Sequence, residues 1–159
     1  MPGSSHLLIV DDSPTQLRQM RMILEQDGFE VHEATHGEAA AIAVMQNPPM
    51  LVITDLQMPG MSGLDLVETL RGTNPSVPVV LTTGDGSEDI AADALRRGAA
   101  SYVPKRDLVS TLAQVVRQVL SVGEAARSVQ KLAKYTIESS LKMSLVSDES
   151  IVPSVISRL

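Results

Sequence analysis

The strongest constraint on the fold is a continuous apolar run that ends on an acidic residue. Residues 51–54 (LVIT) lead into Asp55, and the turn-forming residues 56–63 follow at once. An uninterrupted apolar run of this length, bounded by turn signals, is typical of a strand buried on both faces of a parallel sheet. Because ligands bind at the carboxyl ends of the strands in such sheets, we expect Asp55 to lie at the bottom of a site.

Short apolar runs alternate with helical patterns along most of the chain. The predicted strands cover residues 7–10, 29–34, 51–55, 77–82 and 100–103. The predicted helices begin at or just after Ser13, Gly37, Gly63, Ser87 and Asp107. Five alternations of strand and helix predict a parallel sheet with helices on both faces. The expected class is therefore a flavodoxin-like α/β fold, a (βα)5 doubly wound sheet in the order 2-1-3-4-5 with a C-terminal helical extension.

The first helix has three start signals. Ser13 suits the N-cap position, Pro14 suits the first helical position, and Gln16 would complete a capping box with Ser13. We therefore expect this helix to begin at Pro14 and to face the core with Leu17 and Met20.

Composition removes several classes of partner. The net charge of −6 argues against a broad basic face for nucleic acid, and one Phe, two Tyr and no Trp leave no platform for stacking bases. The absence of cysteine excludes disulfides and thiolate metal sites. No apolar run approaches the roughly 20 residues of a membrane span, and the first residues lack a signal-peptide pattern. We expect a cytoplasmic protein whose segment here binds neither nucleic acid nor a membrane.

Acidic residues follow two strands that are neighbours in the predicted sheet. Asp11 and Asp12 follow the first strand and Asp55 ends the third, so three carboxylates would converge and repel unless a cation compensates them. Oxygen ligands without His or Cys suit a hard divalent ion such as Mg²⁺. A carboxylate beside such an ion can be a nucleophile toward a phosphoryl group. Thr82 and Lys105, at the ends of the fourth and fifth strands, are placed to bind phosphoryl oxygens.

Each of these five residues also has an ordinary structural interpretation. An Asp-Asp pair at a strand end usually caps a helix or lies in a solvated turn, and a single lysine is usually a surface group. The functional interpretation is favoured because all five lie at the carboxyl ends of strands, where sheets of this kind bind ligands.

Four segments of the chain resemble the receiver domain of the two-component response regulators, across about residues 5–122. They are Ile-Val-Asp-Asp-Ser at 9–13, Asp-Leu-Gln-Met-Pro-Gly-Met-Ser-Gly at 55–63, Leu-Thr-Thr-Gly at 81–84 and Gly-Ala-Ala-Ser-Tyr-Val-Pro-Lys at 98–105. The segment at 55–63 is the most specific of the four, and the others add order and spacing.

The resemblance implies a phosphoacceptor and a metal site. Asp55 would accept a phosphoryl group from a partner histidine kinase or phosphotransfer protein. Asp12, Asp55 and the backbone carbonyl of Gln57 would hold Mg²⁺, and Asp11 would help through water.

The resemblance also implies which residues respond to the phosphoryl group. Lys105 matches the family's phosphate-binding lysine, and Thr82 and Tyr102 match its switch pair. In this hypothesis an added charge of about −1.5 to −2 draws Thr82 toward the new oxygens and lets Tyr102 turn inward. The surface of the fourth helix, the fifth strand and the last helix would then change and control an output domain or a partner.

The loop after the fifth strand departs from the family pattern. The family usually has a proline after the lysine, joined by a cis bond, whereas Arg106 follows Lys105 here and Pro104 precedes it. A cis bond without proline costs about 3–4 kcal/mol, so the Lys105–Arg106 bond is expected to be either trans or strained.

Other function classes share parts of this pattern. One is a receiver-like interaction module that works without phosphate. Another is an aspartyl-phosphate phosphatase of the haloacid dehalogenase type, but such enzymes need an acid two residues after the nucleophile, where Gln57 stands. A flavodoxin-like electron carrier lacks an aromatic residue placed to stack a flavin. We therefore expect a signalling protein that at most catalyses its own phosphorylation and dephosphorylation, rather than an enzyme.

Residues beyond about 122 exceed what a receiver needs. We expect a helical linker at 123–136, and at 137–159 a fragment of a linker or of a truncated output domain. Residues 141–145 alternate like an exposed strand, and Pro153 could open a helix that runs to Leu159. This last fragment is similar to the start of an anti-sigma-type kinase ATPase domain that follows some receivers.

A heptad-like series of small and apolar residues runs into this tail. Its members are Val115, Val119, Val122, Ala126, Val129 and Ala133. The series is typical of a helix core followed by a linker, or of a helix that extends into a dimer or a downstream domain. A dimer could therefore use either this helix or the surface of the fourth helix, the fifth strand and the last helix.

Overall fold

A computed structural model gives the backbone of residues 5–156 and the side chains of residues 5–145. The chain divides into two units, Met1–Ser121 and Val122–Leu159. No helix among the described residues is long and apolar enough to cross a membrane.

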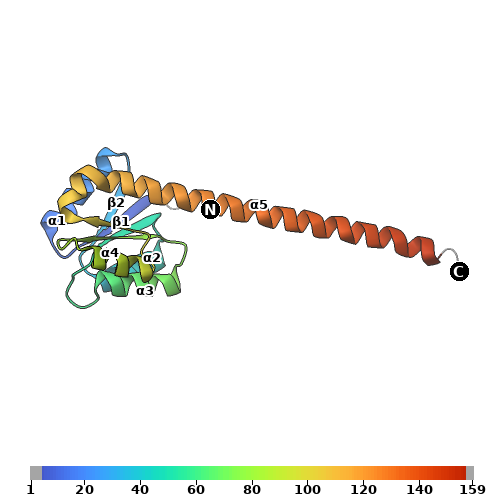
Figure 1. The fold of residues 1–159 in the computed structure, drawn as a ribbon, viewed down its shortest axis with the longest axis horizontal. Helices are drawn as coiled ribbons and strands as arrows, with labels where there is room; N and C mark the ends of the chain where they lie inside the picture. The colour runs from blue at the N-terminus through green and yellow to red at the C-terminus, as the bar shows by residue number, and fades with distance from the viewer. Residues whose placement is uncertain (1–4, 157–159) are drawn as a thin grey trace. The chain divides into compact units, whose positions relative to one another are not determined.

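The first unit contains one parallel sheet of five strands (Figure 1). The strands are β1 (His6–Val10), β2 (Glu30–Ala34), β3 (Leu51–Asp55), β4 (Val79–Thr83) and β5 (Ser101–Pro104). Their order is β2-β1-β3-β4-β5, which confirms the predicted topology. The helices are α1 (Pro14–Gln26), α2 (Gly37–Gln46), α3 (Gly63–Thr73), α4 (Glu88–Arg96) and α5 (Leu108–Ile156), with a 3₁₀ turn η1 (Lys105–Asp107) before α5.

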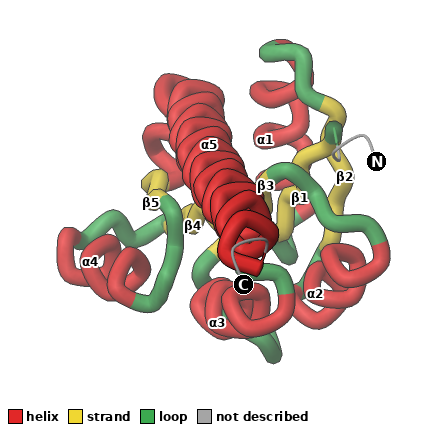
Figure 2. The backbone as a smooth tube through the Cα atoms, turned by 90° about the vertical axis from the view of Figure 1, so that its right-hand side faces the viewer, coloured by secondary structure: helices red, strands yellow, loops and turns green. Residues whose placement is uncertain are grey.

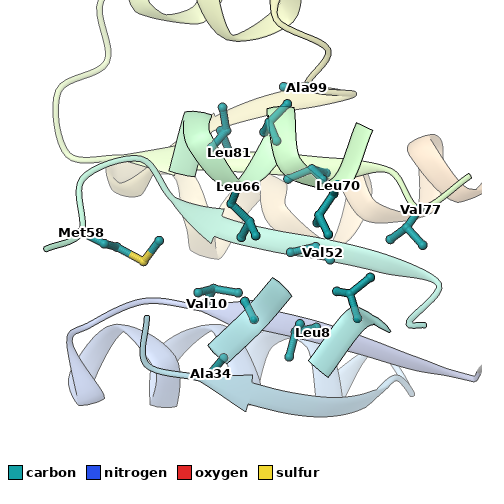
Figure 3. Packing of buried hydrophobic residues seen from close by; sticks show 14 of the residues in the cluster. Leu8, Val10, Ala34, Val52, Met58, Leu66, Leu70, Val77, Leu81 and Ala99 are labelled. Carbon is teal, nitrogen blue, oxygen red and sulfur yellow. The ribbon is translucent and has the colours of Figure 1, made fainter. Parts of the chain in front are cut away.

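Helices cover both faces of the sheet (Figure 2). Two apolar clusters lie between the sheet and these helices. Helices α2, α3 and α4 lie on one face, where Val10, Val52 and Leu66 belong to a single packed cluster (Figure 3). Helix α1 and the first turns of α5 lie on the other face, where Ile9 and Leu112 are fully buried. All five residues of β1, β3 and β4 are buried, as expected for strands covered on both sides.

The fourth strand begins later than its apolar run. Val77 is in a turn, where its N–H donates to the carbonyl of Asn74, and Pro78 has no N–H to donate to a strand ladder. The strand therefore starts at Val79, although the carbonyl of Pro78 still accepts from the N–H of Val52.

Helix α1 begins at Pro14 as predicted, but the capping box is only half formed. Ser13 Oγ accepts from the N–H of Gln16 at 3.4 Å. In the reciprocal bond, the N–H of Ser13 would donate to the Gln16 side chain. This bond does not form, because that N–H donates instead to Asp11 Oδ1 at 2.9 Å. Gln16 Oε1 is left buried without a hydrogen-bond partner among the described residues, so that part of the prediction is wrong.

The predicted strand at 141–145 is also wrong, because these residues are in α5. Leu, Lys and Met are good helix formers, and an isolated strand would leave its backbone groups without partners. Pro153 lies inside α5 rather than at the start of a new helix, and Leu159 is outside the described residues. The division of the tail at 136 into a linker and an output fragment stays a prediction.

Gly63 lets α3 begin directly against the end of β3. A Cβ atom at this position would lie 2.2 Å from the carbonyl oxygen of Asp55 and 2.9 Å from Leu56 Cα. The N–H of Gly63 also donates to the carbonyl of Leu56 at 2.9 Å. Any larger residue would therefore push the helix away from the segment that carries Asp55.

We expect Gly63→Ala to lower the free energy of unfolding by about 1–3 kcal/mol, because the added methyl group overlaps backbone atoms. Gly72→Ala in the same helix is the control, since a Cβ there meets nothing within 4 Å. The control should be neutral or stabilise by about 0.5–1 kcal/mol. Urea unfolding measures both, and equal effects of the two substitutions would contradict the close approach at Gly63.

Candidate functional site

The carboxyl ends of β1, β3, β4 and β5 bring the predicted site residues to one edge of the sheet. Asp55 pairs in register with Thr82 on β4, and Val10 pairs with the residue before Asp55. Asp11 and Asp12 follow β1 directly, and Lys105 follows β5. The parallel pairing thus gathers these residues, although they are far apart in the sequence.

Three carboxylates meet at this edge. One oxygen each of Asp11, Asp12 and Asp55 lies within 4.8 Å of the others. Asp11 is fully buried and Asp55 is 4% exposed, whereas Asp12 is exposed to solvent. The group therefore has a buried inner part and one carboxylate at the surface.

Lys105 is the cation that faces this acidic group. Its Nζ lies 3.0 Å from Asp11 Oδ2 and 3.3 Å from Asp55 Oδ1. Burial alone would lower the pKa of Lys105, but the hydrogen bond and charge of Asp11, together with Asp55, outweigh burial and raise that pKa. The lysine is therefore held in its charged form.

The charge of Asp55 is only partly compensated. Burial and the neighbouring charge of Asp11 raise the pKa of Asp55 above its ordinary value. Lys105 and the backbone N–H of Gln57, which donates to the Asp55 carboxylate, oppose this shift without cancelling it. A further positive charge near Asp55 would favour its ionised form.

The donor set fits a hard divalent cation. The group offers oxygen ligands only, and the buried Asp11 Oδ2 has Lys105 Nζ 3.0 Å away. Mg²⁺ prefers oxygen ligands and retains several waters, which the exposed Asp12 side of the group allows. Such a cation would also offset the repulsion among the three carboxylates.

Thr82 and Tyr102 occupy different surroundings. Thr82 is fully buried, and its Oγ1 donates to the carbonyl of Thr54 at 3.4 Å, next to Asp55. Tyr102 is outside the carboxylate group, and its hydroxyl donates at 3.0 Å to the carbonyl of Asp85 in the loop after β4. Burial, then the charge of Asp85, raises the pKa of the Tyr102 hydroxyl. Thr82 thus lies beside Asp55 near the end of β4, and Tyr102 contacts the loop that follows this strand.

The backbone after β5 resolves the alternative left open by the sequence. No cis peptide bond occurs in the part of the chain that the structure describes, so the Lys105–Arg106 bond is trans. Lys105 reaches both carboxylates from the start of the η1 turn.

Two supporting contacts were not predicted. The N–H of Ser13 donates to Asp11 Oδ1, two residues earlier, and fixes the orientation of that carboxylate. The Asp-x-Ser pattern at a strand end could have indicated this bond. Glu38 Oε1 accepts from the N–H of Met61 at 3.0 Å, in the loop after Asp55. These two residues are 23 positions apart, so no local pattern points to their contact.

Comparisons with known proteins agree on one family. The family model described as the response regulator receiver domain matches residues 7–117. The transcriptional regulatory protein KdpE of Mycobacterium tuberculosis is 33% identical over 136 residues, which is 83% of this chain and 60% of that protein. SrrA of Staphylococcus aureus, also a transcriptional regulatory protein, is 31% identical over 122 residues, which is 74% of this chain and 50% of that protein.

The solved structures show the same fold. A CheY-like receiver domain protein from Methanospirillum hungatei JF-1 superposes with a TM-score of 0.72 and 26% identity, covering 78% of this chain and 99% of the other. The chain spans only about half to three fifths of the length of the two curated relatives above. The likeness therefore concerns the sheet and its surrounding helices.

The raised pKa of Asp55 predicts that its ionised carboxylate destabilises the folded, metal-free protein in a pH-dependent way. Because the folded state holds its proton more tightly than the unfolded state, stability falls as pH rises from the ordinary value of 3.8 through the raised folded pKa. We expect Asp55→Asn, in EDTA, to be more stable than the wild type at neutral pH. This advantage should shrink as the pH falls from the raised folded pKa toward 3.8, and should be lost below 3.8.

Thermal unfolding of both proteins between pH 3 and pH 8 measures this difference. A constant difference in stability across that range, or a wild type more stable than the variant at neutral pH, would contradict the electrostatic description of Asp55.

Proposed function

Because this chain belongs to the response regulator receiver family, we propose that it accepts a phosphoryl group on Asp55 in a Mg²⁺-dependent reaction. The donor would be a partner histidine kinase or phosphotransfer protein. The observation that carries the proposal is the buried carboxylate of Asp55 beside Asp11, Asp12 and the ion-paired Lys105. The protein acts as a phosphoacceptor switch whose only chemistry is its own phosphorylation and dephosphorylation.

In the transfer step, a carboxylate oxygen of Asp55 attacks the phosphorus atom of the donor. The new bond joins that oxygen to phosphorus, and the bond from phosphorus to the leaving group breaks with its electron pair. Asp11, Asp12, Asp55 and the carbonyl of Gln57 would hold Mg²⁺, which neutralises charge on the phosphoryl oxygens when bound.

Lys105 and Thr82 have complementary parts in this reaction. The ammonium group of Lys105, already 3.3 Å from Asp55 Oδ1, binds a phosphoryl oxygen and offsets its charge. The Thr82 hydroxyl exchanges its 3.4 Å bond to the Thr54 carbonyl for a bond to another phosphoryl oxygen. The exchange is favourable because a hydrogen bond to an ionised acceptor is about twice as strong as a neutral one.

Movement of Thr82 is the proposed start of the switch. It shifts the loop after β4, whose Asp85 carbonyl holds the Tyr102 hydroxyl, and Tyr102 then turns inward. The surface of α4, β5 and α5 changes and controls an output domain or an effector protein. Conversion of a 1:99 equilibrium to 99:1 needs about 5.5 kcal/mol, which the metal and several charge-assisted bonds would supply together.

Intact mass after incubation with acetyl phosphate tests the proposal. We expect the wild type to gain the mass of one phosphoryl group with Mg²⁺ present and to gain none in EDTA. Asp55→Asn should fold and gain none under either condition. Labelling of that variant would contradict the assignment, and a folded wild type that gains no mass would favour an interaction module that works without phosphate.

The cellular setting follows from the same proposal. We place the protein in the cytoplasm, where it would meet its kinase, and expect no direct contact of this segment with nucleic acid or a membrane. The net charge of −6 and the small number of aromatic residues support the expectation that this segment does not contact nucleic acid.

We also propose that residues 122–145 of α5 pair with a second copy of the chain. Val122, Val129 and Leu132 are each at least 65% exposed. At 3.6 residues per turn, all the charged residues of this stretch fall within an arc of about 80° on the opposite side from Val129. They are Glu124, Arg127, Lys131, Lys134, Glu138 and Lys142. Two copies could therefore meet along the apolar side without facing like charges.

Sedimentation over a range of concentrations tests this pairing. We expect a dimer for the wild type and a monomer for Val129→Lys, because the variant places a charge in the middle of the apolar side. Lys131→Ala, which changes the charged side, should still form the dimer. A wild type that stays monomeric at all concentrations would contradict the pairing.

A further inference from the structure

The loop between β3 and α3 starts at the candidate phosphoacceptor and ends against α2. At its first residue, the N–H of Leu56 donates to the carbonyl of Thr82 at 2.8 Å. The side chain of Met58 is buried in the cluster between the sheet and helices α2 and α3 (Figure 3). Between these residues lies Gln57, whose N–H donates to Asp55.

The far end of this loop is held by the first turn of α2. Glu38 Oε1 accepts a hydrogen bond from the N–H of Met61 at 3.0 Å. A Cβ on Gly37 would lie 2.8 Å from Met61 Cβ, so only glycine allows this close approach. Gly60 has φ of +77°, and a Cβ there would lie 2.8 Å from Glu38 Oε1. Gly37 and Glu38 of α2 thus fit closely against Gly60 and Met61 of the loop.

Glu38 has a particular place among these contacts. Among the hydrogen bonds of the described residues, only Asp55 and Glu38 accept from the loop backbone with side chains that lie outside the loop and α3. Its carboxylate is ionised at neutral pH, because the hydrogen bonds from its own N–H and from Met61 lower its pKa. A charged acceptor forms the stronger kind of hydrogen bond.

We infer that Glu38 is a positioning residue for the metal site, and that its bond to Met61 fixes the loop whose Gln57 carbonyl would bind the cation. The inference rests on the proposed function, because it concerns the same Mg²⁺ site. Glu38 acts through the loop backbone and does not touch the metal. Loss of the bond lets residues 57–61 sample other positions, and each position away from the site weakens the Gln57 contact.

Mg²⁺ titration followed by calorimetry and by amide chemical shifts tests the inference without any phosphodonor. We expect Glu38→Ala to raise the dissociation constant for Mg²⁺ about threefold to tenfold, in line with the loss of one hydrogen bond. Glu38→Gln keeps an acceptor oxygen at the same place and should stay within about twofold of the wild type. Circular dichroism shows whether each variant is folded.

A second readout reports on the bond itself. The exchange of the Met61 amide with solvent should be faster in Glu38→Ala than in the wild type, and slow again in Glu38→Gln. Glu68→Ala is the matched control, because it removes the same charge from a surface ion pair with Arg97. It should change neither the Mg²⁺ affinity nor the exchange of Met61.

The outcomes separate the two claims. A wild type that binds no Mg²⁺ would overturn the proposed function, and this inference with it. A wild type that binds Mg²⁺ while folded Glu38→Ala binds it equally well would overturn the positioning role alone. Equal weakening by Glu38→Ala, Glu38→Gln and Glu68→Ala would also overturn it, since long-range charge would then be the cause.

Discussion

Repulsion among three carboxylates at one edge of the sheet is the constraint on which the rest of the site depends. Asp11 and Asp55 are buried, so neither can be screened by water, and the shift in the Asp55 pKa shows the remaining cost. Lys105 offsets part of this cost from the end of β5. A site that still lacks positive charge suits a divalent cation and, through it, an anionic phosphoryl group. The electrostatic cost in the resting protein and its proposed activity thus have one origin.

The sheet and its loops fix these charges in place. Parallel strands end together at one edge, which is why residues from four strands meet there without any local sequence pattern joining them. The loop after Asp55 is held at its start by Thr82, at its middle by burial of Met58, and at its end by Glu38 and by Gly63. A loop fixed in this way suits a metal site. In the proposed switch, the loop after β4 is the part that moves, and the bond from Tyr102 to Asp85 is the contact that it exchanges.

Much of this could be predicted from the sequence, because buried parallel strands have a clear apolar pattern and their ends define the site. The strand at 51–55 and the gathering of acidic residues around Asp55 were predicted in this way. The environment of the Gln16 side chain was not predicted, because the Asp11 carboxylate accepts the N–H of Ser13 that a capping box requires. The contact between Glu38 and Met61 depends on tertiary packing, and residues 141–145 have an alternating pattern that helix propensity overrides.

The central claim is that Asp55 is the residue that carries the phosphoryl group. Reduction with borohydride after incubation with acetyl phosphate and Mg²⁺ tests it most directly, because it converts an acyl phosphate of aspartate into homoserine at the modified position. Peptide mass spectrometry should then find homoserine at position 55, and only in samples that received both the phosphodonor and the metal. Homoserine at Asp11 or Asp12, or at no position in the folded protein, would contradict the account.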